Sequence, residues 1–496
     1  MTTAEDLTAS TFVSRSPAGG EIVGTFPVHG ADAVAEAVGR ARTAAQWWAA
    51  IGFAERERRL LAFKGVLTRR SDELCELVRR ENGKPVADAF LEVLATVEHL
   101  DWAARKADKA LAPRWVGPGP LMVHHKVTVA HEPFGVVGVI GPWNYPVLTP
   151  MGSIGYALAA GNAVVYKPSE HTPAVGEWLV DAFATVVPEN QVLQLVTGAG
   201  ETGAALCRSG VDKLAFTGSA STGRTVMATC AETLTPVLME CGGNDTLIVD
   251  DDADVDAAAT AAVWGGLQNA GQACISVERV FATDAVYDRF VDTVVALARN
   301  VRSGAGGEAH IGAITTPAQI DTIEAHLVDA LDRGATAVVG GRESVQPPYV
   351  HPVVLVDVPG DARIMHEETF GPILPITRVA DADEAIAIAD STSFSLAVTV
   401  FSGSRGEEIA QRLRAGMVSV NASSAAFSGV PAAPWGGFGE SGFGRIHGEE
   451  GLKEFTRPKA VITRRFDLPF ELFSFERPAW LLGALDRVMK LRHGRR

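Results

Sequence analysis

Two short stretches of the sequence set reactive side chains beside glycines. Residues 238–245 read LMECGGND, with the Glu240 carboxylate next to the Cys241 thiol, and residues 271–276 read GQACIS around Cys274. A thiolate is a strong nucleophile near neutral pH and a carboxylate can act as a general base, so these residues are candidates for covalent catalysis. Neighbours on an extended strand point to opposite faces, so Glu240 and Cys241 are not expected to act on one target. Cys274 follows a predicted helix, in a loop where its side chain can face a cleft.

The remaining cysteines are predicted to be structural. Cys75, Cys207 and Cys230 lie within helical patterns, where cysteine is usually a small buried hydrophobe, and Cys241 is expected to fill an apolar slot. The five cysteines are scattered and lack CxxC spacing, which argues against a disulfide framework and against a zinc site. We therefore predict no metal and a reducing, cytoplasmic environment.

Four loops that follow short apolar runs carry groups suited to a cofactor or to an anionic intermediate. Asn144, within GPWNYP at 141–146, can donate to a developing oxyanion or form an Asx-turn. Lys167 and Glu170, within KPSE, can hold two ribose hydroxyls or form an exposed turn. GAGETG at 198–203 and FTGSASTG at 216–223 each precede a helix, and either can cradle a pyrophosphate.

The elements that must position these loops follow an α/β pattern. Residues 31–112 repeat apolar positions at helical spacing, and then the short apolar runs GVVGVIG, AVVYK and KLAFTG alternate with helical segments at 173–186 and 220–232. This alternation is typical of a parallel sheet with helices on both faces, and a second such series follows Asn244. Ligands bind at the carboxyl ends of the strands in such sheets, where the candidate loops lie.

Composition excludes several classes of protein. A net charge of −15 and a pI near 5.3 disfavour nucleic-acid binding. The N-terminal residues MTTAEDLTAS contain two acids and no apolar core, so no signal peptide is expected. Residues 133–166 carry no charge, but four prolines and repeated glycines make a membrane span unexpected.

The pattern of residues 478–491 predicts a helix with a basic end, and one face of this helix carries Leu481, Leu485, Val488 and Met489. We expect this face either to pack on its own subunit or a partner, or to touch a membrane surface.

Taken together, these motifs resemble the aldehyde dehydrogenase superfamily. GPWNYP, KPSE, FTGS, MECGG, GQACIS, EETFGPI and PWGGFGESGFGR occur in the family's order over nearly the whole chain, to about Thr463. GQACISVERV and the ending RVMKLRHGRR are most similar to the bacterial branch that includes succinate-semialdehyde dehydrogenases. The resemblance implies a Rossmann-type dinucleotide-binding domain at 1–115 and 134–243, an α/β catalytic domain at 244–440, a β oligomerisation arm at 116–133 and 455–466, and a tail at 467–496. It also implies a homodimer or homotetramer.

The resemblance further implies a role for each site residue. Cys274 would add to the aldehyde carbon, Asn144 and the Cys274 N–H would hold the oxyanion, and Glu240 would activate water to hydrolyse the thioester. Lys167 and Glu170 would bind the adenine ribose, Gly218 and Ser219 the pyrophosphate, and Glu368 with Phe370 the nicotinamide ribose and ring. The predicted cofactor-binding set is completed by Trp143, Ser169, Gly200 and Gly242.

Particular residues bear on cofactor and substrate. Glu170 would repel a 2′-phosphate, which favours NAD over NADP. Glu240 favours release of a free acid over transfer to coenzyme A. The loop at 421–437 contains no Arg or Lys, so an aliphatic or aromatic aldehyde is as plausible as an acid semialdehyde. Asn244 stands where the family usually has lysine, and Cys241 where it usually has leucine.

Two other classes of protein are alternatives to an aldehyde dehydrogenase. A cysteine hydrolase would need a histidine beside the nucleophile, and these loops offer none. A catalytically silent cofactor-binding relative is disfavoured because Cys274, Glu240 and Asn144 are all present.

Overall fold

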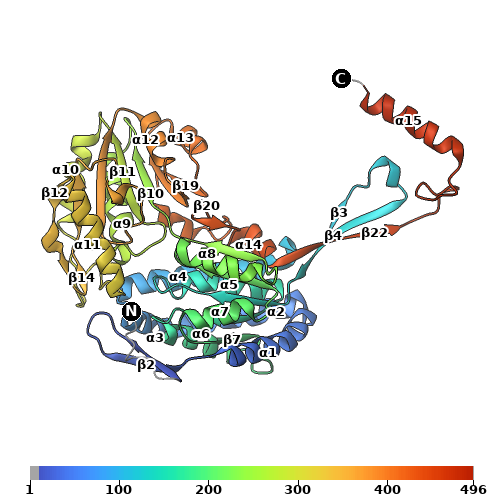
Figure 1. Cartoon of the computed structure of the whole chain (residues 1–496), viewed down its shortest axis with the longest axis horizontal. Helices are drawn as coiled ribbons and strands as arrows, with labels where there is room; N and C mark the ends of the chain where they lie inside the picture. Colours follow the sequence, from blue (N-terminus) through green and yellow to red (C-terminus); the bar gives the residue numbers. More distant parts are fainter. Residues whose placement is uncertain (1–9, 495–496) are drawn as a thin grey trace. The chain divides into compact units, whose positions relative to one another are not determined.

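The computed structural model describes residues 10–494 and divides into two compact units. The first unit comprises Met1–Ala110 and Pro133–Arg457, and the second comprises Leu111–Glu132 and Pro458–Arg496. The first unit contains two large sheets covered by helices (Figure 1). The predicted α/β class is therefore confirmed.

The first large sheet has six strands in the order β21-β9-β8-β5-β6-β7. Its parallel strands are β5 (Val136–Ile140), β6 (Ala163–Lys167), β7 (Leu193–Leu195), β8 (Lys213–Thr217) and β9 (Val237–Glu240). β21 (Gly442–Phe443) adds an antiparallel edge, which the sequence patterns did not predict. Short apolar runs form these parallel strands of three to five residues because both faces of the sheet are buried.

Helices cover this sheet, including the predicted N-terminal group. They are α1 (Ala31–Ala50), α2 (Gly52–Arg69), α3 (Ser71–Asn82), α4 (Val86–Ala110), α5 (Leu148–Ala160), α6 (Pro173–Ala184), α7 (Gly200–Arg208), α8 (Ala220–Ala231) and α14 (Gly448–Glu454). Gly83 ends α3 in the left-handed conformation, with a φ of 93°, and so separates α3 from α4. The helical spacing read in residues 31–112 is thereby confirmed.

The second large sheet has seven strands in the order β12-β15-β16-β11-β10-β18-β19. The strands are β10 (Asp245–Val249), β11 (Val277–Thr283), β12 (Thr336–Val339), β15 (Val353–Val356), β16 (Ile373–Val379), β18 (Ala397–Phe401) and β19 (Met417–Val420). Six of them run parallel, and β12 pairs antiparallel with β15 at the edge. The helices around it are α9 (Val255–Leu267), α10 (Tyr287–Ala298), α11 (Pro317–Asp332), α12 (Ala382–Ala389) and α13 (Gly406–Arg412).

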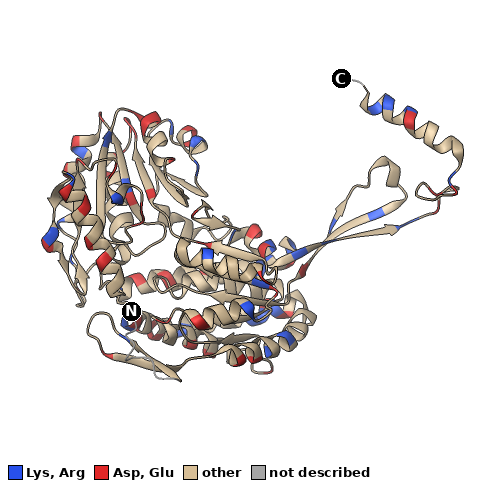
Figure 2. Cartoon of the chain, in the orientation of Figure 1, with Lys and Arg blue, Asp and Glu red and all other residues tan. Residues whose placement is uncertain are grey.

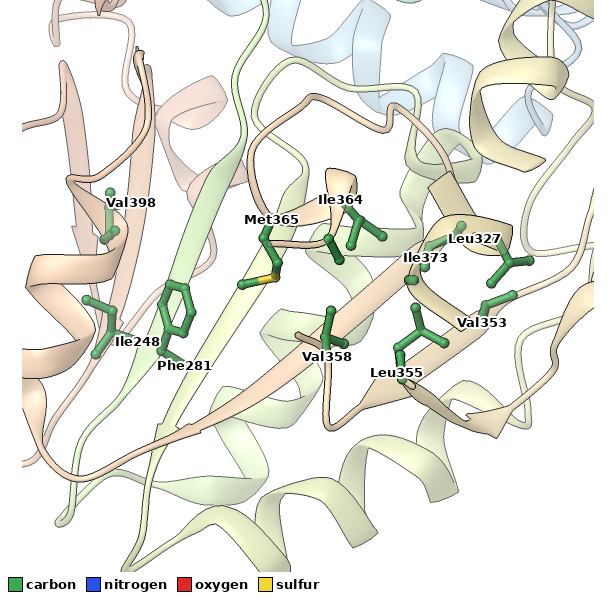
Figure 3. Packing of buried hydrophobic residues seen from close by; sticks show 14 of the residues in the cluster. Ile248, Phe281, Leu327, Val353, Leu355, Val358, Ile364, Met365, Ile373 and Val398 are labelled. Atoms are coloured by element: carbon green, nitrogen blue, oxygen red, sulfur yellow. The ribbon is translucent and has the colours of Figure 1, made fainter. Parts of the chain in front are cut away.

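Side chains on the central strands of this sheet alternate between two cores. Ile248 and Phe281 belong to the core on one face, which also contains Met365 and, farther across the sheet beside Ile373, Leu327 of α11 (Figure 3). Their neighbours along each strand, including Leu247, belong to the opposite core against α9 and α10. A strand buried on both faces therefore reads as a continuous apolar run, because the period-two alternation separates two apolar environments.

Several short elements complete the first unit. An N-terminal hairpin of β1 (Thr11–Arg15) and β2 (Ile22–Pro27) was not anticipated from the sequence. The remaining strands are β13 (Val345–Gln346), β14 (Tyr349–Val350), β17 (Phe394–Ser395) and β20 (Phe438–Gly439), and the 3-10 turns are η2 (Gln268–Gly271), η3 (Arg342–Ser344), η4 (Arg363–Met365) and η5 (Ser424–Gly429).

The second unit is built on a three-stranded sheet of order β22-β4-β3, in which β3 (Arg114–Val116), β4 (His125–Pro133) and β22 (Thr456–Arg464) take part. A turn η1 (Pro120–Met122) precedes β4, and α15 (Ala479–His493) forms the predicted C-terminal helix. Leu481 is buried and lines an apolar cavity of this unit with Leu485, whereas Val488 and Met489 stay 53% and 55% exposed. The last turn of α15 contains Lys490 and Arg492, and the ribbon is blue near this end of the helix (Figure 2). No helix within residues 10–494 is both long and apolar enough to cross a membrane.

Candidate active site

The loop that carries Cys274 is shaped by three consecutive left-handed residues. Asn269, Ala270 and Gly271 have φ angles of 49°, 55° and 74° and turn the chain sharply after α9. A Cβ on Gly271 would overlap the backbone of Gly371, so only glycine allows this close approach. Cys274 emerges from this turn partly exposed, whereas the other four cysteines are buried. The prediction that Cys75, Cys207, Cys230 and Cys241 are buried is thus confirmed.

Two cavities meet at Cys274. A smaller cavity of about 180 Å³ contains the predicted residues Trp143, Asn144, Gly218, Ser219, Gly242, Glu368 and Phe370. A larger cavity of about 410 Å³ leads away from Cys274 between α4, α9 and η5. Thr149 also lines both, so the Cys274 thiol lies at the junction of the two cavities.

Asn144 is held rigidly beside the cysteine loop. Its side-chain Nδ2 donates to the Gln272 carbonyl at 3.1 Å, and its own carbonyl accepts from Lys84 Nζ at 2.7 Å and from Asn269 Nδ2 at 3.1 Å. The side chain is buried, at 6% exposure. These contacts fix an amide donor near Cys274, as a rigidly placed oxyanion donor requires.

Glu240 ends β9 as a buried carboxyl group that few polar neighbours stabilise. Among the described residues, its Oε1 has no hydrogen-bond partner. Burial raises the pKa of Glu240 to about 8, although Arg445 opposes this shift. Burial, with the nearby Glu240, Asp245 and Glu368 carboxylates, also raises the pKa of the Cys274 thiol well above its usual range. The resting site therefore holds a neutral Cys274 thiol near Glu240, whose pKa of about 8 allows it to gain or lose a proton near neutral pH.

Glu278 fixes the turn that carries Glu368 and Phe370. Its two carboxylate oxygens accept from Thr369 N at 2.8 Å and Phe370 N at 2.7 Å, and Oε2 also accepts from Asn244 Nδ2 at 3.1 Å. Burial raises the pKa of Glu278 to about 7 despite these bonds. Asn244 thus supplies a neutral donor to a buried carboxyl group, which gives this unusual residue a structural reason.

The same turn presents Glu368 to the glycines after Glu240. Gly243 N donates to Glu368 Oε1 at 3.0 Å, and a Cβ on Gly242 would overlap the Glu368 carboxylate. The Trp143 and Phe370 rings meet edge to face with centroids 5.6 Å apart. Glycine at 242 therefore allows the Glu368 carboxyl group to approach the backbone closely, in the same cavity as the two aromatic rings.

The two glycine-rich loops occupy different places. Gly218 lines the smaller cavity, and Ser219 caps the N-terminus of α8 by accepting from Thr222 N at 3.3 Å. Gly200 starts α7 but lines neither of the two cavities at Cys274, and Thr202 of this loop donates to the carbonyl of His29 at 2.8 Å. The structure therefore brings the FTGS loop, and not the GxGxxG loop, to the reactive thiol.

Lys167 and Glu170 lie together at the end of β6. Lys167 Nζ is 3.9 Å from Glu170 Oε2 and donates to the Pro168 carbonyl at 2.9 Å. Burial lowers the pKa of Lys167, and the Glu170 carboxylate keeps its own pKa low through Lys167 and His171 despite burial. Ser169 is buried in the same turn, where its Oγ accepts from His171 N at 3.3 Å. The turn therefore places a carboxylate that can accept hydrogen bonds from hydroxyl groups beside a lysine that can donate to them.

Two positioning residues were missed by sequence reasoning. Lys84 and Glu92 form an ion pair of 2.7 Å in which both side chains are completely buried. Glu92 Oε1 also accepts from Val147 N at 2.7 Å and Leu148 N at 3.1 Å, so the pair anchors the loop around Asn144. Nothing in the local sequence distinguishes this lysine from an exposed one, because its burial depends on packing between α4 and the loop.

Comparison with known proteins identifies the class. The profile of the Aldehyde dehydrogenase family matches residues 4–461. A 4,4'-diapolycopene aldehyde oxidase of Methylomonas sp is 36% identical over 468 residues, covering 93% of this chain and 87% of that protein. A putative succinate-semialdehyde dehydrogenase [NADP(+)] of Mycolicibacterium smegmatis is 38% identical over 451 residues, covering 89% and 86%. The crystal structure of an NAD-dependent aldehyde dehydrogenase from Sinorhizobium meliloti superposes with a TM-score of 0.89 at 33% identity, covering 94% of this chain and 93% of that one.

The chain belongs to the aldehyde dehydrogenase family. It is accordingly an oxidoreductase that oxidises aldehydes with a nicotinamide cofactor. The resemblance read from the motifs is confirmed, including the similarity to bacterial semialdehyde dehydrogenases. Family membership favours this class over the cysteine hydrolase.

Proposed function

We propose that the protein oxidises an aldehyde to a carboxylic acid with NAD, using Cys274 as nucleophile. The meeting of two cavities at Cys274 carries this proposal. One cavity offers an aldehyde access to the thiol, and the other brings cofactor-binding groups to the same sulfur.

The residues of the smaller cavity and of the turn after β6 fit parts of a dinucleotide. The capped N-terminus of α8 suits a pyrophosphate, the Glu368 carboxylate beside Gly242 suits a ribose, and Lys167 with Glu170, outside this cavity at the end of β6, suits the hydroxyls of the other ribose. Nicotinamide, when bound, supplies the acceptor for the hydride that leaves the aldehyde carbon.

The protein's own groups account for the covalent steps. Cys274 releases its thiol proton to water and its sulfur adds to the carbonyl carbon, while Asn144 Nδ2 and the Cys274 N–H stabilise the oxygen that becomes negative. After loss of hydride the acyl group is a thioester on Cys274. Glu240 then takes a proton from water, whose oxygen attacks the thioester, and it returns this proton to the sulfur as the carboxylic acid leaves.

We propose NAD rather than NADP because Glu170 stays ionised beside the position expected for the 2′-hydroxyl. A 2′-phosphate would approach this carboxylate in a partly desolvated site, where like charges repel strongly. Some relatives carry NADP(+) in their names, so the preference is a property to be tested in this chain.

The decisive experiment follows formation of reduced nicotinamide over a panel of aldehydes. Cys274→Ala should abolish turnover, whereas the matched control Cys75→Ala, at a buried cysteine of α3, should retain it. Glu240→Gln should keep a burst of reduced cofactor and slow the steady state, because only thioester hydrolysis needs the base. Turnover in Cys274→Ala equal to wild type would overturn the mechanism, and no turnover by the wild type with any aldehyde would favour the silent relative.

We also propose the assignments that the resemblance implied for domains, assembly and compartment. The division at residue 244 is supported by the separate six- and seven-stranded sheets, and the arm by the three-stranded sheet of the second unit. A homodimer or homotetramer is expected by light scattering. A catalytic thiol suits the cytoplasm, which fractionation would test.

A further inference from the structure

The larger cavity at Cys274 has a strongly apolar wall. Leu91, Leu94, Leu148, Trp264, Ile275 and Trp435 contribute to its lining. These side chains come from α4, α5, α9 and the loops beside them, so they are part of the folded framework. A cavity of about 410 Å³ with such a wall can surround the hydrocarbon part of a medium-sized ligand.

The charges in this cavity are all acidic. No Lys or Arg lines it within the described residues, whereas Asp88, Glu92 and Glu98 do. The one cation nearby, Lys84, is committed to Glu92 at 2.7 Å and to the Asn144 carbonyl at 2.7 Å. A carboxylate on the far end of a substrate would therefore meet no unpaired positive group along this wall.

The mouth of the cavity continues into exposed apolar surface. Leu91, Leu94 and Trp264 line the cavity and are still 49%, 45% and 38% exposed. Phe90 beside them on α4 and Val430 after η5 are 48% and 47% exposed. Large side chains of this kind at a cavity mouth provide contact area for a ligand that extends beyond the cavity.

Resting on the proposed function, we infer that the substrate is an uncharged aldehyde with a long apolar tail, and that this site discriminates against acid semialdehydes. The aldehyde group reaches Cys274, the first part of the tail fills the cavity, and the remainder contacts Leu91, Leu94 and Trp264. An ionised tail would lose its hydration without gaining a partner and would lie near Asp88 and Glu98, so it binds poorly.

The test compares kcat/KM over straight-chain aldehydes from propanal to decanal, and between glutarate semialdehyde and its methyl ester. Each methylene that enters the cavity should raise kcat/KM about fourfold until the wall is filled. The ester should exceed the acid by at least about 100-fold, because only the acid buries an unpaired charge. A flat dependence on chain length, or an acid equal to or better than its ester, overturns the inference.

Two variants separate an effect on substrate recognition from a general loss of activity. Glu98→Arg should raise kcat/KM for glutarate semialdehyde at least about tenfold relative to Glu324→Arg, which makes the same charge change at an exposed position of α11. Trp264→Ala should lower the ratio of kcat/KM for decanal to kcat/KM for propanal, a split that loss of folding would not produce. Equal losses for both aldehydes, or no gain from Glu98→Arg, count against the inference.

The same panel distinguishes the two levels of proposal. Absence of turnover with every aldehyde refutes the proposed function itself. Turnover that favours semialdehydes leaves the oxidation in place and refutes only the substrate class.

Discussion

Replacing Lys84 by methionine tests whether the buried ion pair positions Asn144. Lys84 Nζ lies 2.7 Å from Glu92 Oε2, 2.7 Å from the Asn144 carbonyl and 3.9 Å from the centroid of the Tyr145 ring. Methionine keeps most of the volume and removes the charge and both hydrogen bonds. Glu92 would then be a buried carboxyl group without its cation.

Breaking a buried pair on one side costs about 3–5 kcal/mol of unfolding free energy. We expect Lys84→Met to lower the unfolding free energy by about 3 kcal/mol, near the lower end of this range, because Glu92 keeps its hydrogen bonds from Val147 N and Leu148 N. Displacement of the loop around Asn144 should also reduce kcat/KM by about 100-fold, as loss of one oriented donor does.

The assay is urea unfolding followed by fluorescence, together with steady-state kinetics. Lys453→Met, which removes an exposed lysine 3.4 Å from Glu449, is the matched control and should change the unfolding free energy by less than about 1 kcal/mol. The double variant Lys84→Met/Glu92→Leu should recover part of the stability, since it leaves no unpaired charge, but not the activity. A Lys84→Met protein with the stability and kcat/KM of wild type would refute the reasoning.

Three further predictions concern Glu240, Glu170 and Asn244. Because burial raises the pKa of Glu240 to about 8, its basic form accumulates as pH rises, so steady-state turnover should increase through about pH 8. Glu240→Gln should abolish this increase and retain the burst, and a pH profile unchanged by the substitution contradicts the assignment. Glu170→Ser should raise the NADP to NAD ratio of kcat/KM at least about tenfold, and an unaltered ratio would count against its role. Asn244→Leu should raise KM for NAD more than it lowers kcat, because Glu278 loses a donor at 3.1 Å and holds the Phe370 turn less firmly; a change in kcat alone would disagree.

Much of the fold was readable because its strands are buried on both faces. Runs such as AVVYK became β6 and KLAFT became β8, since continuous apolar strands in a parallel sheet need no long-range information to be recognised. The run TAVV was recognised and became β12, whereas the antiparallel edge β21 was missed because a strand of two residues leaves too short a pattern. The β1–β2 hairpin was not predicted although its strands have five and six residues, because TFVSR and IVGTFP are only partly buried and form no continuous apolar run.

The sequence by itself determined the family, and it named Cys274, Glu240 and Asn144 as the proposed reactive groups because their types and motif contexts are local properties. Only the tertiary structure decided which partners they have. It placed the loop of Gly218 at the thiol and turned the loop of Gly200 toward His29, and it buried Lys84 where its charge must be paired. Burial, the direction of a pKa shift and the meeting of two cavities depend on residues far apart in the chain, so no local pattern encodes them.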